Sequence, residues 1–170
     1  MTYSTIAAWK TYASDRGQTD IAAADDDDLT TALLRGSEAE DARYEHQFPG
    51  VRTDGRDQTR AWPRKMSNGD KVTDAFGQTI LTSAVPDEVV RAAYELARAE
   101  LTTPGSLAPQ FTPGTRVKST SETVGPLSEE TTYFDAGGSD TAQMPVLTIV
   151  DGILAPLIGA KSNTTSLKRM

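Results

Sequence analysis

VPDEVVRAAYELARAEL, residues 85–101, carries the strongest helical signal in the chain. Its apolar residues recur at spacings of three and four, which places them in one stripe along a helix and leaves charged residues opposite. Pro86 suits a first helical position, and Asp87 opposes the positive end of the helix dipole. We therefore predict a core helix over residues 86–102 with no chemistry on it. The side chains expected in the core are Val89, Ala93, Leu96, Ala97 and Leu101.

The composition narrows the function classes. A chain of 170 residues forms one domain, with room for extended arms. Its net charge of −7 leaves no broad basic face, which argues against sequence-specific binding of double-stranded DNA. The chain contains no cysteine and a single histidine, so disulfides, zinc fingers, thiol nucleophiles and histidine-cluster metal sites are excluded.

The sequence shows no membrane or export signal. The first ten residues, MTYSTIAAWK, lack a basic stretch followed by an apolar run, so no signal peptide is expected. The longest apolar run, residues 146–159, is interrupted by Asp151 and Pro156 and is shorter than the roughly 20 residues of a membrane span. We expect a soluble protein of the cytoplasm with no membrane partner.

Three further helices are expected, over residues about 5–14, 28–47 and 145–155. Four consecutive aspartates, residues 25–28, precede the second of these and raise the question of a metal site. Adjacent helical residues point in different directions, so the four carboxylates cannot converge on one ion. An N-cap followed by acidic residues in the first turn is the favoured interpretation, and we predict no metal site.

Residues 51–83 contain many turn-forming residues and are expected to be irregular. Within them, Trp62 and Pro63 form a corner, since proline drives the preceding residue out of the helical region. We predict that Trp62 and Pro63 belong to the structural core. The alternative is that Trp62 stacks on bases, with Arg60, Arg64 and Lys65 contacting phosphates.

A polar β-hairpin is expected over residues about 115–134, after a proline-rich connector. The last residues, 159–170, are small and polar and cannot form a core of their own, so they are expected to be an arm that becomes ordered on a partner. We predict one domain over residues 1–158 followed by this arm. The fold class is mainly α: a small helical bundle with an inserted β-hairpin and an extended C-terminal arm.

No catalytic motif is present. The chain lacks GxSxG, GxxxxGK[ST] and GxGxxG, and no pattern places two carboxylates in one apolar pocket. His46 follows Glu45 near a helix end, which favours a surface or capping role. We predict that the protein is not an enzyme and uses no cofactor.

Six short motifs follow one another along the chain. They are YST followed by AAWKTYASDRG at 3–17, EDARY at 40–44, AWPR at 61–64, VPDEV at 85–89, VGPL at 124–127 and LAPL at 154–157. In this order they resemble the head-to-tail connector, or adaptor, proteins of tailed bacteriophages, a domain family also described as DnaT-like and single-stranded-DNA-binding. Residues 51–58 and the GGSD loop at 137–140 match nothing in that family.

The resemblance implies a structural virion protein, assembled in the host cytoplasm. Such a protein forms a ring, commonly a dodecamer, below the portal in the neck, where it joins capsid to tail and continues the DNA channel. The implied partners are the portal protein, tail or neck proteins, further copies of the chain, and double-stranded DNA that passes without sequence-specific binding. An acidic surface fits a channel, because carboxylates repel phosphate.

The contact residues expected from this resemblance form two groups. Those expected on the portal are Leu167, Lys168, Arg169 and Met170, and those expected between subunits are Val117, Leu127, Tyr133 and Phe134. Two other functions stay open. One is a single-stranded-DNA-binding module built on Trp62 and its neighbouring cations, and the other is a generic structural scaffold domain.

Overall fold

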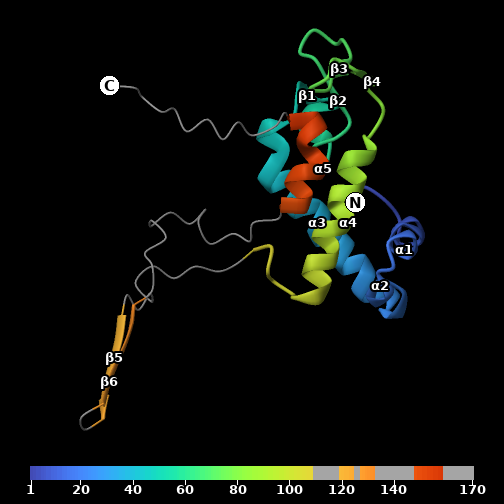
Figure 1. Ribbon diagram of the computed structural model, residues 1–170. Coiled ribbons are helices and arrows are strands. Elements are labelled where there is room, and N and C mark those ends of the chain that lie inside the picture. Colours follow the sequence, from blue (N-terminus) through green and yellow to red (C-terminus); the bar gives the residue numbers. More distant parts are fainter. Residues whose placement is uncertain (109–118, 125–126, 133–147, 159–170) are drawn as a thin grey trace, which may run out of the picture. The chain divides into compact units, whose positions relative to one another are not determined.

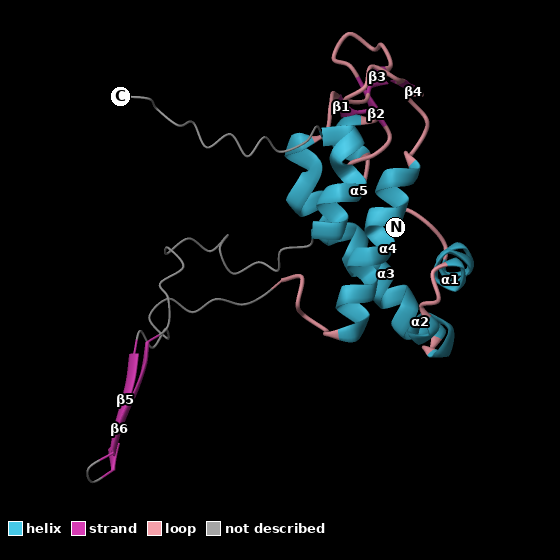
Figure 2. Ribbon diagram, viewed as in Figure 1, coloured by secondary structure: helices cyan, strands magenta, loops and turns pink. Residues whose placement is uncertain are grey.

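The computed structural model describes residues 1–108, 119–124, 127–132 and 148–158. They fall into two units: residues 1–107 together with 147–170, and residues 108–146. The first unit is helical and the second contains a β-hairpin, so the predicted mainly α fold class is confirmed (Figure 2).

The helical unit is built around two long helices (Figure 1). These are α3, Asp26–Tyr44, and α4, Asp87–Thr102, which pack against each other along their lengths. α5, Thr148–Ile158, packs on α4, while α1, Ile6–Asp15, packs on α3 and on the short α2, Thr19–Ala23. None of the described helices is long and apolar enough to cross a membrane.

Helix boundaries follow local capping. Asp25 is the N-cap of α3, where its side chain accepts a hydrogen bond from the Asp27 N–H at 2.9 Å, so α3 begins two residues before the predicted start. Its last predicted turn is instead the 3-10 helix η1, Glu45–Gln47. Pro86 is the N-cap of α4 and not its first helical residue.

Two helical features differ from the sequence prediction. α5 spans Thr148–Ile158 where residues 145–155 were expected, and Pro156 lies inside its last turn. The carbonyl of Pro156 accepts a hydrogen bond from the Ala75 N–H at 2.8 Å, so a neighbouring loop supports this helix end. α2 was not predicted, because five residues are too few to show helical periodicity.

The prediction that residues 51–83 are irregular is wrong in part, because they contain four strands of two residues each. β1, Val51–Arg52, pairs antiparallel with β2, Arg64–Lys65, and β3, Val72–Thr73, pairs antiparallel with β4, Thr79–Ile80. Strands this short show no alternation in the sequence. Figure 1 shows both hairpins together at one end of the bundle, and we call residues 51–84 the hairpin end.

The core of this unit contains two clusters, which α4 joins. One gathers Trp62 with α3, α4 and α5, and the other gathers Trp9 with α2, α3 and α4. Among the residues predicted for the core, Val89, Ala93, Leu96, Ala97 and Trp62 are at most 1 % exposed. Leu101 is only partly buried against the second cluster, and Pro63 is half-buried.

The second unit contains one antiparallel hairpin, with β5, Ser119–Val124, and β6, Leu127–Thr132, paired from Val124 opposite Leu127 to Ser119 opposite Thr132. Of the predicted inter-subunit residues, Leu127 lies in β6 with only its backbone described. The others lie outside the described residues, as does the whole arm 159–170 with its predicted portal contacts; they are Val117, Tyr133, Phe134, Leu167, Lys168, Arg169 and Met170.

Candidate nucleic-acid interface

Trp62 faces the interior of the protein. Its side chain is 1 % exposed, and its ring meets the Phe48 ring edge-on with 5.6 Å between the centroids. The peptide bond to Pro63 is cis. A ring enclosed in this way has no face open to a base, so Trp62 cannot be a stacking platform.

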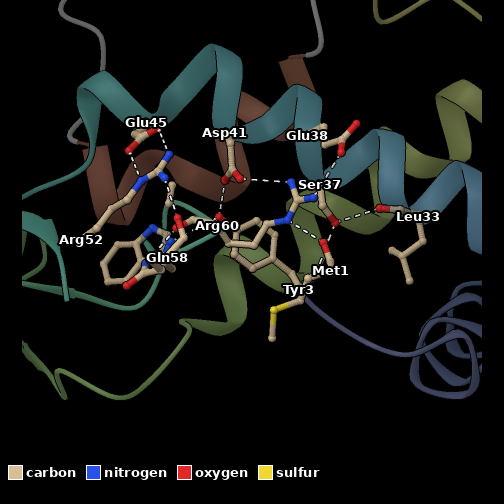
Figure 3. Close-up of polar contacts among 12 residues, drawn as sticks. Met1, Tyr3, Leu33, Ser37, Glu38, Asp41, Glu45, Arg52, Gln58 and Arg60 are labelled. Carbon is tan, nitrogen blue, oxygen red and sulfur yellow. Dashed lines mark hydrogen bonds and ion pairs between the residues drawn. The ribbon is translucent and has the colours of Figure 1, made fainter. Parts of the chain in front are cut away.

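Arg60 is also directed inward, as Figure 3 shows. Its Nε donates to the Met1 carbonyl at 2.6 Å, Nη1 donates to Asp41 at 3.2 Å, and Nη2 lies 3.5 Å from Glu38. The side chain is 6 % exposed. Arg60 therefore anchors the N-terminal segment to α3 and is not free to contact a phosphate.

Arg64 is buried as well, and its guanidinium forms hydrogen bonds with backbone carbonyls. It donates to the carbonyls of Pro49 at 2.8 Å, Ala61 at 3.1 Å and Gly50 at 2.6 Å. Burial lowers the pKa of Arg64, although Glu45 acts in the opposite direction. The alternative drawn from the sequence was a DNA-binding site in which Trp62 stacks on bases while Arg60, Arg64 and Lys65 contact phosphates. Only Lys65 of these four is accessible, so this particular arrangement is wrong.

Apolar side chains are exposed at the hairpin end. Val51, Met66, Phe76 and Leu81 are between 43 % and 78 % exposed, and these four are most of the large hydrophobic side chains exposed in the described residues. Phe76 is the most exposed of the four. Exposed apolar side chains that gather at one end of a molecule are typical of an interaction site.

The turn between β3 and β4 holds Phe76 in a fixed position. The Asp74 carboxylate accepts hydrogen bonds from the backbone N–H groups of Phe76 at 2.9 Å and Gln78 at 2.7 Å. Gly77 supplies the positive φ of 80° that the turn needs, and the Ala75 N–H is bonded to α5 as described above. The Phe76 ring is therefore presented to solvent by an ordered turn.

Three cations accompany these apolar side chains. Arg56 and Lys71 are exposed, Lys65 is half-buried, and the side chains of these three form no hydrogen bond or ion pair within the described part of the chain. Residues 51–84 contain six basic and four acidic residues, against eleven basic and twenty acidic residues elsewhere. Residues 51–84 thus have an excess of basic over acidic residues in a chain that is acidic as a whole.

An open pocket of about 450 Å³ lies at the same end, lined by Val51, Arg52, Gly55 and Arg56. Arg52 is held in place by Glu45, with two bonds of 2.6 and 2.7 Å, and these bonds lower the pKa of Glu45. Arg56 carries an unpaired charge into the pocket lining. Arg56 is therefore the cation of this pocket that is available to an anionic group such as a phosphate, while the charge of Arg52 is already paired with Glu45.

The sequence reasoning missed the residues of this interface. The stretch AFGQ, residues 75–78, entered the prediction only as part of the turn-rich residues 51–83. The sequence signal for an exposed ring there is an aromatic residue that follows Asp74 and precedes Gly77. Asp25 caps α3 with Asp26, Asp27 and Asp28 in its first turn, as predicted, and His46 is exposed in η1. No group of three acidic or histidine residues in the described ranges is placed to hold a metal.

A family model matches residues 2–170, and its description reads "Putative DnaT-like ssDNA binding protein". The chain belongs to this family, since the match covers nearly its whole length. No curated protein and no solved structure matches the chain.

Proposed function

We propose that the chain binds single-stranded DNA through the hairpin end. The observation that carries the proposal is Phe76, a ring 78 % exposed on an ordered turn. Every base has a π-face, so such a ring supports stacking that tolerates any sequence, at about 1–3 kcal/mol per base. The description of the family supports the same function.

The phosphates are assigned to Arg56, Lys65 and Lys71, whose charges have no partner in the described residues. Each phosphate neutralised on a single strand releases counterions and contributes about −0.7 to the slope of log K against log salt concentration. Three contacts correspond to a slope of about −2. A net charge of −7 keeps this binding modest and strongly salt-dependent.

The experiment is fluorescence anisotropy of a labelled oligothymidine at several salt concentrations. Phe76→Ala is expected to weaken binding by about 5- to 150-fold, which is the stacking free energy expressed as a ratio. Arg56→Gln with Lys71→Gln is expected to reduce the salt slope by about 1.4. Both changes are at exposed positions, so the melting temperature should stay unchanged.

Lys10→Gln is the matched control, because it removes a cation from α1, where Lys10 pairs with Asp26 at 2.6 Å. It should leave oligonucleotide binding unaltered. Equal binding by wild type and Phe76→Ala, or no binding by the wild type at micromolar protein and low salt, would contradict the proposal.

A second candidate function is the ring-forming connector of a phage neck. Two observations favour it. The net charge of −7 suits a channel through which DNA slides. Trp62, Arg60 and Arg64 are buried in the fold, so they are not available to bind DNA. The residues predicted to lie between subunits, Val117, Leu127, Tyr133 and Phe134, belong to the unit of residues 108–146. In this proposal the protein resides in the virion neck, between portal and tail proteins.

Electron microscopy of the purified protein with its cognate portal tests this second function. A ring on the portal, with loss of attachment when residues 160–170 are deleted, is the expected result. Attachment by the truncated protein would contradict the predicted contacts at Leu167, Lys168, Arg169 and Met170. Ring formation without oligonucleotide binding would replace the first function by the second, and the absence of both would leave a generic structural domain.

A further inference from the structure

Glu40 of α3 is fully buried at 0 % exposure, and neither of its carboxyl oxygens has a hydrogen-bond partner among the described residues. An ionised carboxylate in such a place has lost its water and gained no donor, which is far less favourable than burial of the neutral acid. The site therefore favours an uncharged carboxylic acid. The proposed nucleic-acid interface does not use this residue.

The charged and titratable groups around Glu40 come from several elements. α3 contributes Asp41 and Tyr44, the N-terminal segment contributes Tyr3, and the loop before β2 contributes Arg60. On α5, Asp151 accepts a hydrogen bond from the Tyr44 hydroxyl at 2.8 Å. The apolar residues of α4 that are at most 1 % exposed include Val89, Ala92, Ala93 and Leu96.

These surroundings do not compensate for a charge on Glu40. Burial raises the pKa of Glu40 well above its usual range, the neighbouring Asp41 raises it further, and Arg60 acts in the opposite direction. Arg60 is already shared between Asp41, Glu38 and the Met1 carbonyl. Each of its three nitrogens already donates to one of these acceptors, so reorienting the planar guanidinium toward Glu40 would disturb those bonds.

The same cluster fastens the N-terminal segment, residues 1–4, to α3 (Figure 3). The Tyr3 hydroxyl donates to Asp41, the Tyr3 N–H donates to Ser37 Oγ at 3.4 Å, and the Trp62 N–H lies 3.4 Å from the Tyr3 hydroxyl. The Arg60 bond to the Met1 carbonyl adds to this attachment, and a hydrogen bond of 2.5 Å between the Ser4 and Tyr94 hydroxyls ties the same segment to α4. Asp41 thus binds Tyr3 of the N-terminal segment and Arg60 of the hairpin end, and Arg60 in turn binds Met1.

We propose that Glu40 is a proton-dependent latch: its carboxyl is uncharged while the N-terminal segment is docked on α3, and its ionisation releases that segment. A new negative charge beside Asp41 draws Arg60 away from Asp41 and from the Met1 carbonyl. The segment then loses its buried cation, and the base of the hairpin end loses its tie to α3. This inference is independent of DNA binding.

The sign of the pH effect follows from linkage. A carboxyl whose pKa is raised in the docked state keeps a proton that the released state gives up. The stability contributed by the docked state is fully present below the unfolded-state pKa of about 4.5. This stability is lost as the pH rises from the unfolded-state pKa to the raised pKa of the docked state. The equilibrium constant between the docked and the released segment changes by up to tenfold per pH unit, because one proton is lost.

The test compares wild type with Glu40→Gln, which keeps the shape and removes the charge. Hydrogen exchange of peptides covering residues 1–5 is measured from pH 5 to pH 9 as a ratio between the two proteins, so that intrinsic exchange rates cancel. We expect protection in the wild type to fall relative to Glu40→Gln by up to tenfold per pH unit. Glu38→Gln, a change at a mostly exposed carboxylate that also contacts Arg60, should follow the wild type.

Carbon-13 NMR of the side-chain carboxyls in the wild-type protein reads the protonation of Glu40 without any substitution. Glu40→Leu serves as a second uncharged variant if Glu40→Gln fails to fold. A Glu40 carboxyl already ionised at pH 5, or identical pH dependence of N-terminal protection in wild type and the uncharged variant, would overturn the latch. Either result leaves the oligonucleotide experiment unaffected, because Phe76 is not part of this cluster.

Discussion

Gly36 of α3 lies directly against the backbone of Ala97 in α4. A Cβ on Gly36 would lie 2.6 Å from the Ala97 nitrogen and 2.9 Å from the Ala93 oxygen. Both atoms belong to a helix backbone, so neither can move aside as the end of a flexible side chain would. The close packing of α3 on α4 therefore depends on the absence of a side chain at position 36.

Gly36→Ala is expected to destabilise the fold by about 1–3 kcal/mol or more, because the added methyl overpacks a backbone contact. The measurement is the free energy of unfolding from denaturant titration. Gly152→Ala is the matched control: Gly152 also lies in a helix, and a Cβ there meets nothing within 4 Å. Higher helix propensity should stabilise that variant by up to about 1 kcal/mol. Equal destabilisation by both changes would contradict the packing argument.

Trp62→Ala is expected to lower the free energy of unfolding by about 3–5 kcal/mol, the usual cost of removing a buried aromatic ring. Trp62→Phe should cost less, since it retains part of the contact with Phe48. The folded fraction of either variant should bind oligothymidine as the wild type does. A Trp62→Ala variant that kept its stability and lost oligonucleotide binding would restore Trp62 as the stacking residue.

Arg64→Lys is expected to be destabilising although it preserves the charge. The guanidinium reaches three carbonyls at once, and an ammonium group on a flexible stem cannot reproduce that planar arrangement. Each buried carbonyl left without a donor costs about 1–3 kcal/mol. Arg56→Lys is the control, since Arg56 is exposed and unpaired in the described residues. Thermal unfolding of the two variants side by side distinguishes a structural arginine from a free one.

The helices that could be predicted are those whose sequence signals lie within a few residues of one another. α4 was visible because its apolar stripe recurs over sixteen residues and its first turn is acidic. The start of α3 was visible because an aspartate that caps a helix acts on the backbone two residues away. Such effects lie within a few residues of their cause, so the linear sequence contains them in full.

The candidate site could not be predicted in the same way, because exposure depends on what packs around a residue. Trp62 and Phe76 are both aromatic residues in turn-rich segments, yet one is 1 % exposed and the other 78 %. The residues that enclose Trp62 belong to α3, α4 and α5, and the farthest of them, Leu157, is almost a hundred positions from Trp62 in the sequence. Strands of two residues likewise carry no periodicity of their own.

The sequence by itself determined the fold class, the central helix and the capping aspartate of α3, since helical periodicity and capping are local properties. The role of Pro86 as the N-cap of α4 was not predicted. Only the tertiary structure decided which polar residues became internal. Glu40 sits in the stretch EDARY and reads as one more charge on a helix surface. It is buried in the fold, where Tyr3 and Arg60, which are distant in the chain, bond to the neighbouring Asp41 of α3. The same fold removes Arg60 and Trp62 from solvent and leaves Phe76 and the free cations of the hairpin end exposed.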